Sequence, residues 1–130
     1  MRIRLSPLLL LALLLAGALP GPAFAEKKEE GAYVAIDTLT ATVMAGDGRH
    51  QVMTVQAGVD APDPALRAYA EKVTPRLRDA YTQVLQLYAG GLTPGAPPDA
   101  DYVARRLQEA TDRVLGKPGA KFLIGGIMIN

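Results

Sequence analysis

The side chains that could do chemistry are few. The single histidine, His50, lies just past a predicted hairpin turn at the start of a strand. A metal site or a catalytic dyad would need a partner for it, but the chain has no cysteine and no second histidine. The one serine, Ser6, falls within a predicted signal peptide, which removes a seryl nucleophile from the mature chain. We therefore interpret His50 as a structural or solvent-exposed residue.

Carboxylates offer two further candidates. Asp37 lies among apolar residues of a predicted strand, where a buried carboxylate would need a partner or a raised pKa. The alternatives are that its face is wet at this point or that it pairs with an arginine. A second group consists of four aspartates, a number that could suggest a metal site. Its members, however, precede prolines or lie at the starts of helices, where aspartate commonly caps the helix. They are Asp60, Asp63, Asp99 and Asp101.

The remaining motifs indicate structure. Gly125-Gly126 lies inside a strand pattern, which is typical of a bulge or of the close approach of another backbone. The chain has neither a dinucleotide-binding nor a phosphate-binding glycine motif. Four tyrosines fall on predicted helices at core-like spacing: Tyr69, Tyr81, Tyr88 and Tyr102. The sequence therefore predicts no catalytic, cofactor-binding or metal-binding residues and favours a protein that is not an enzyme.

The N-terminus has the pattern of a secretory signal peptide over residues 1–25. Arg2 and Arg4 precede the apolar run 8–19, and the sequence Ala-Phe-Ala at 23–25 is typical of a cleavage site. The alternative is an uncleaved short membrane anchor. We expect a periplasmic protein, or one associated with the inner membrane and facing the periplasm if the segment is retained.

The length and composition of the mature chain limit its possible fold and partners. Residues 26–32 form a charged tether, and residues 33–130 suffice for a single domain. The whole chain has a net charge of +1, and removal of Arg2 and Arg4 leaves about −1, so nucleic acid is not an expected partner. The absence of cysteine excludes a disulfide scaffold and is compatible with a bacterial periplasm.

The patterns predict two strands and then helices. The segments 32–44 and 51–59 flank the turn signal Asp47-Gly48 and predict an antiparallel hairpin. In the first strand, period two places Asp37 on one face with Tyr33, Ala35, Leu39, Ala41 and Val43. A helix should begin at Asp63-Pro64, break near Val73 and restart at Pro75.

The second half of the domain should hold a long helix, a loop, another helix and a strand. After Pro75, the apolar stripe consists of Leu77, Ala80, Tyr81, Val84, Leu87 and Tyr88, with Arg76 and Arg78 on the wet side. A helix capped by Asp99 or Asp101 should end at Gly116. The final segment, 122–129, is apolar on both faces, which predicts a central strand. The order β-β-α-α-β predicts an α+β fold: a small antiparallel sheet with two to three helices on one face.

With these elements placed, the chain resembles the periplasmic domain of the flagellar basal-body-associated FliL family. The resembling segments are the strand Tyr-Val-Ala-Ile-Asp-Thr-Leu at 33–39, Pro-Arg-Leu-Arg-Asp-Ala at 75–80, Arg-Val-Leu-Gly at 113–116, and the apolar final strand ending at Asn130. Together they span residues 33–130. The short apolar run and the tether 26–32 depart from the family, whose members usually keep a membrane helix and a longer linker.

The resemblance implies a stomatin-like domain in a non-enzymatic accessory protein that supports motility. Its expected partners are a flagellar stator or basal-body component, a homo-oligomer of the same chain, and the inner-membrane surface. The alternative is a periplasmic module, unrelated to motility, that binds a small apolar ligand between sheet and helices. This second hypothesis predicts a monomer with an apolar cavity of a few hundred Å³.

Overall fold

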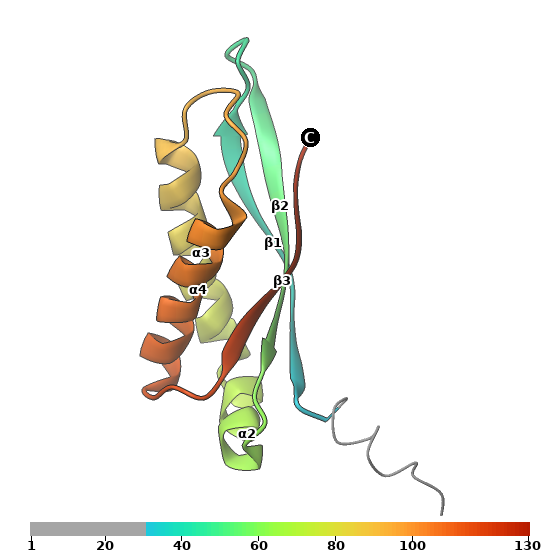
Figure 1. Ribbon diagram of the computed structural model, residues 1–130, viewed down its shortest axis with the longest axis vertical. Coiled ribbons are helices and arrows are strands. Elements are labelled where there is room, and N and C mark those ends of the chain that lie inside the picture. Colours follow the sequence, from blue (N-terminus) through green and yellow to red (C-terminus); the bar gives the residue numbers. More distant parts are fainter. Residues whose placement is uncertain (1–30) are drawn as a thin grey trace, which may run out of the picture.

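The computed structural model describes residues 31–130 as one layer of strands covered by helices (Figure 1). The elements are β1 (Tyr33–Met44), β2 (His50–Asp60), α2 (Pro64–Lys72), α3 (Thr74–Gly91), α4 (Ala100–Leu115) and β3 (Lys121–Ile129). The three strands form an antiparallel sheet in the order β1-β2-β3. α3 packs over β1 and α4 packs over β3, while α2 lies at one end of the sheet. The predicted α+β fold is confirmed.

Local signals set the ends of the elements where the sequence predicted them. Gly48 has a φ of 86° in the hairpin turn, a conformation that favours glycine. The Asp63 side chain accepts a hydrogen bond from the Leu66 backbone at 3.0 Å and caps α2. Asp99 caps α4 in the same way through the amide of Tyr102, and the left-handed Gly116 ends that helix.

β1 contains a bulge that changes which residues face the core. The pairing shifts between Ala35 and Asp37, so Ile36 has no partner of its own on β2. The inner face therefore consists of Val34, Ile36, Leu39, Ala41 and Val43. The predicted grouping of Tyr33, Ala35 and Asp37 with the core residues is wrong, because the extra residue reverses the alternation at Ile36.

Asp37 occupies the strained position of this bulge, with a φ of 69°, the only positive φ outside glycine among residues 31–130. Aspartate tolerates this left-handed region, whereas a β-branched residue does not. We expect Asp37→Val to lower the free energy of unfolding by about 1–3 kcal/mol, although valine favours strands. Urea unfolding measures the change. Asp37→Asn is the control and should stay within about 0.5 kcal/mol, and equal stability of the two variants would contradict the strained bulge.

β3 lies at an edge of the sheet, so the prediction of a central strand is wrong. It pairs only with β2, and the pairing shifts where Gly125 is inserted opposite Gln56 and Ala57. This bulge, which the two glycines predicted, shifts the alternation of the side chains between the two faces of the strand. Before and after it the inward residues are Phe122, Ile124, Ile127 and Ile129. Leu123 and Met128 lie on the opposite face, so the strand is apolar on both faces although it is an edge strand, and Phe122 is its one buried residue.

α3 differs from its predicted stripe in both its buried and its exposed residues. Its buried residues are Leu77, Tyr81, Leu85 and Ala89, and the Leu87 side chain is 80% exposed. Arg78 is not on the wet side: its half-buried guanidinium donates hydrogen bonds to the backbone carbonyls of Ile36 and Thr38, the second at 3.4 Å. The helix therefore bonds directly to the bulge in β1.

Nothing in the described part of the chain tests the N-terminal predictions. The signal peptide 1–25 and most of the tether 26–32 lie outside the described residues. Within residues 31–130, none of the helices has the length and apolar character needed to cross a bilayer. The periplasmic location stays a prediction.

Candidate functional site on the uncovered sheet face

The residues singled out for chemistry do not come together. His50 is exposed at the start of β2, opposite Met44. Asp63 and Asp99 are helix caps at separate positions, and residues 31–130 contain no group of three or more potential metal ligands. Asp37 is exposed, so the interpretation of a wet face at this point is confirmed.

The buried hydrogen bond between Tyr81 and Thr111 is part of the protein core. Tyr81 is fully buried, and its hydroxyl lies 2.6 Å from Thr111 Oγ1, which itself donates to the Leu107 carbonyl at 2.8 Å. Thr111 has one proton, so Tyr81 donates to it. Burial raises the pKa of Tyr81 to about 12, the Thr111 hydroxyl lowers it because it can turn to donate to the ionised phenolate, and the charge of Asp112 adds to the rise. A neutral, hydrogen-bonded tyrosine packed edge-on against Phe122 at 5.1 Å is a structural group.

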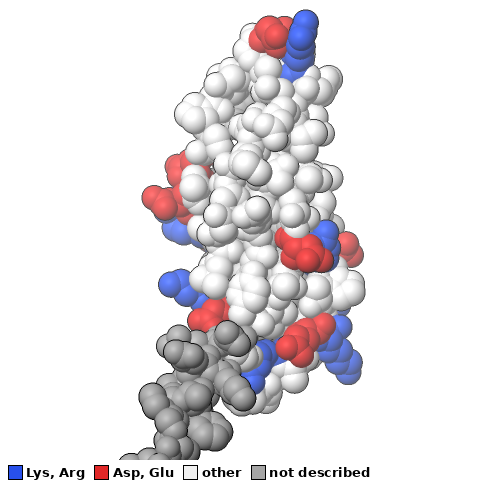
Figure 2. All heavy atoms as spheres, turned by 90° about the vertical axis from the view of Figure 1, so that its right-hand side faces the viewer, with Lys and Arg blue, Asp and Glu red and all other residues white. Residues whose placement is uncertain are grey.

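The feature that stands out is the face of the sheet opposite the helices. Its side chains are Tyr33, Ala35, Thr38, Thr40, Thr42, Met44, Val52, Thr54, Gln56, Leu123 and Met128. We call this set the uncovered face. No charged residue occurs in 38–44, 52–56 or 122–130. Figure 2 shows the same face, with charged side chains at its ends and margins and an uncharged centre.

The uncovered face also concentrates exposed apolar side chains. The exposed fractions are 50% for Tyr33, 42% for Met44, 47% for Val52 and 52% for Met128. These are four of the seven large hydrophobic residues that are exposed in the described part of the chain. Exposed apolar surface gathered on one uncharged face is typical of a surface that contacts another protein.

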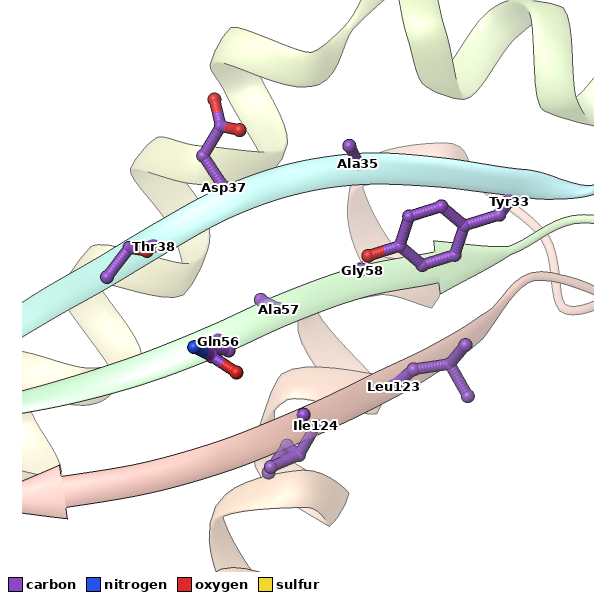
Figure 3. Close-up of a pocket in the computed structure, with 10 residues that line it drawn as sticks. Tyr33, Ala35, Asp37, Thr38, Gln56, Ala57, Gly58, Leu123 and Ile124 are labelled. Atoms are coloured by element: carbon purple, nitrogen blue, oxygen red, sulfur yellow. The ribbon is translucent and has the colours of Figure 1, made fainter.

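A hollow of about 530 Å³ lies on this face at the level of the two bulges. Figure 3 shows the Tyr33 ring across β2 over Gly58, and Gln56 reaching from β2 toward β3. A side chain at Gly58 would collide with the Tyr33 ring, and a Cβ at Gly125 would lie 3.2 Å from Gln56 Oε1. Gly58 is therefore required for the close packing of Tyr33 over β2, and at Gly125 a side chain would displace Gln56 slightly.

The strands that form the floor of the hollow are hydrogen-bonded to a helix on the opposite face of the sheet. The β1 bulge places the carbonyls of Ile36 and Thr38 within reach of Arg78 on α3. The β3 bulge lies directly across β2, at Gly125. Sequence reasoning missed Arg78, because its position on the outer flank of the helix gives no sign of a contact made 42 residues away.

The hollow offers few groups for catalysis. Its side chains that could accept or donate a proton are Tyr33, Asp37, Thr38 and Gln56. Asp37 points away from β2 in Figure 3, so it does not converge with Gln56 or the Tyr33 hydroxyl. The arrangement presents a shaped surface whose one charged group, the Asp37 carboxylate, lies at its margin, and it suits contact with another molecule.

Comparison with known proteins assigns the chain to no family. No family model matches the sequence, and no curated protein matches it. The function must therefore be argued from the residues and the fold.

Proposed function

We propose that the protein is a non-enzymatic accessory protein of the flagellar basal body or stator, similar to the FliL family, which supports motility through protein–protein contact. The observation that carries the contact is the uncovered face, an uncharged surface with four exposed large apolar side chains. The flagellar assignment rests on the resemblance of the segments 33–39, 75–80, 113–116 and 122–130 to that family.

In this proposal, the uncovered face binds a periplasmic segment of the stator or basal body. The partner surface would itself be uncharged and apolar, because a buried charge without a partner costs several kcal/mol. The helical layer faces away and carries charged residues such as the exposed ion pair between Arg106 and Glu109 at 3.0 Å. Export through the N-terminal segment would place the domain in the periplasm, where it could meet such a partner.

The test is swimming by the native host. Deletion of the gene should reduce expansion in soft agar, and expression of the wild-type chain should restore it. Val52→Glu, which places a charge on the central strand of the uncovered face, should fail to restore swimming although the protein accumulates. Gln83→Glu, a charge on the exposed side of α3, is the control and should restore it. Normal swimming of the deletion strain would refute the flagellar role.

A second candidate function is the binding of a small apolar ligand. The observation that favours it is the hollow of about 530 Å³, whose volume falls in the range of ligand sites. This hollow lies on the uncovered face, whereas the sequence hypothesis placed a ligand between sheet and helices. The swimming experiment separates the candidates, because a ligand-binding module unrelated to motility leaves soft-agar expansion unchanged.

A further inference from the structure

The two edges of the sheet differ in how their outward backbone groups are satisfied. On β1, Arg78 donates to the Thr38 carbonyl near one end, and the Gly95 amide donates to the Met44 carbonyl at 3.0 Å at the other end. These contacts occupy outward carbonyls near the β1 bulge and at the hairpin end of the strand. Such coverage is a common means of preventing unwanted strand pairing.

The first part of β3 is covered in a similar way. The Gln108 side chain on α4 accepts from the Phe122 amide and donates to the Ala120 carbonyl, both at 2.8 Å. The amide group thus takes the place of a neighbouring strand at the beginning of β3. No equivalent side chain among residues 31–130 bonds to the edge beyond the bulge.

The hydrogen-bond register identifies the outward groups of this last part. Val52 and Asn130 exchange two backbone hydrogen bonds, at 2.8 Å and 3.1 Å. In an antiparallel ladder, bonded pairs alternate with non-bonded pairs. Met128 opposite Thr54 is therefore the next bonded pair, and Ile127 and Ile129 direct their N–H and C=O groups away from β2. The edge presents two donors and two acceptors to solvent.

We infer that these groups pair with the same strand of a second copy of the chain. In an antiparallel arrangement about a two-fold axis at Met128, Ile127 lies opposite Ile129 of the copy, and the two pairs form four hydrogen bonds. Residues 122–130 contain no charged side chain, so the identical strand meets no like charge. The pairing joins two three-stranded sheets into one of six strands.

Geometry and area indicate the strength of this contact. In Figure 1, the end of β3 extends past the start of α4, and Met128 in this part of the strand is 52% exposed. The pairing involves about five residues, or roughly 16 Å of strand. This is much less than the roughly 800 Å² per partner of a stable interface, so the dimer should be weak and should depend on concentration. The inference does not rest on the proposed flagellar function.

The test uses protein produced from the full 130-residue sequence in a bacterial periplasm. Sedimentation equilibrium from about 10 µM to about 1 mM should show a dimer fraction that rises with concentration. Hydrogen exchange measured by NMR adds residue-level evidence. The amide of Met128 should be protected at every concentration, because it bonds to β2, whereas the amides of Ile127 and Ile129 should become protected only as the dimer forms.

Two variants locate the contact. Met128→Lys places two like charges across the axis and should weaken association at least tenfold, and Ile129→Pro removes one outward N–H without removing a bond to β2. Met44→Lys is the matched control, since it adds the same charge at a similarly exposed site on β1, and it should associate like the wild type. A monomer at 1 mM overturns the inference. So does a dimer that persists in Met128→Lys or that leaves Ile127 and Ile129 in fast exchange.

Discussion

Replacing Arg78 by methionine is expected to destabilise the protein by about 1.5–3 kcal/mol, because the guanidinium bonds to two backbone carbonyls of the β1 bulge. Methionine keeps much of the apolar stem that packs at this half-buried position, so the loss reports mainly the hydrogen bonds. The bulge residue Ile36 has no partner on β2, and its carbonyl depends on Arg78. Urea unfolding of the purified protein measures the effect.

The neighbouring arginine supplies the control for this experiment. Arg76 lies in the same first turn of α3 but is exposed, so Arg76→Met should change stability by no more than about 0.5 kcal/mol. Arg78→Lys keeps the charge but lacks the fork of donors and should fall between the wild type and Arg78→Met. If Arg78→Met unfolds at the same urea concentration as Arg76→Met, the contact with the bulge does not stabilise the fold.

The same substitution tests the protection of the β1 edge. Without Arg78, the carbonyls of Ile36 and Thr38 become acceptors that another strand could use. We therefore expect Arg78→Met to form larger species on gel filtration at concentrations where Arg76→Met does not. Arg78 would then both stabilise the fold and prevent strand pairing at this edge.

The parts of the fold that follow from local chemistry were predictable from the sequence. The hairpin depends on Asp47-Gly48, and the helix starts depend on Asp63-Pro64 and Asp99, residues that act within a few positions of themselves. The break at Val73 follows from the proline two positions later. These signals identify the elements and their order without any knowledge of tertiary contacts.

The sheet faces and the sheet order were not predictable in the same way. A single extra residue in β1 and another in β3 reverse the alternation of the side chains, and a period-two pattern assumes that no such residue exists. Gly125-Gly126 indicates a bulge, but the apolar run alone predicts burial on both faces. Applying the bulge to the pattern would have placed Phe122, Ile124, Ile127 and Ile129 on one face.

The candidate site depends on the positions of the two bulges. The uncovered face joins Tyr33 and Ala35 to Thr38, Thr40 and Thr42 only because the β1 bulge lies between these two groups. The hollow requires both bulges to lie at the same level of β2. The sequence therefore contained the residues of the surface but not the register that assembles them.

The second large effect should appear at alkaline pH and comes from Tyr81. The pKa of this buried phenol is raised from 10.0 to about 12, chiefly by desolvation. Between these values the unfolded chain releases the proton while the folded chain holds it, so stability is fully present below about pH 10 and is lost as the pH rises through about 12. The full difference corresponds to roughly 3 kcal/mol, of which about half should be lost at pH 11.

Tyr81→Phe isolates this contribution from that of every other titrating group. The variant loses the hydrogen bond to Thr111, which should cost about 1 kcal/mol near neutral pH, while Thr111 keeps its bond to the Leu107 carbonyl. Because phenylalanine does not ionise, the variant lacks the alkaline loss, and the two stabilities should become equal near pH 11. Urea unfolding of both proteins at pH 8, 10 and 11 measures this convergence. Parallel curves with a constant difference would show that Tyr81 ionises in the folded protein as readily as in the unfolded chain, and the buried hydrogen bond of Tyr81 with Thr111 would then have to be open to water.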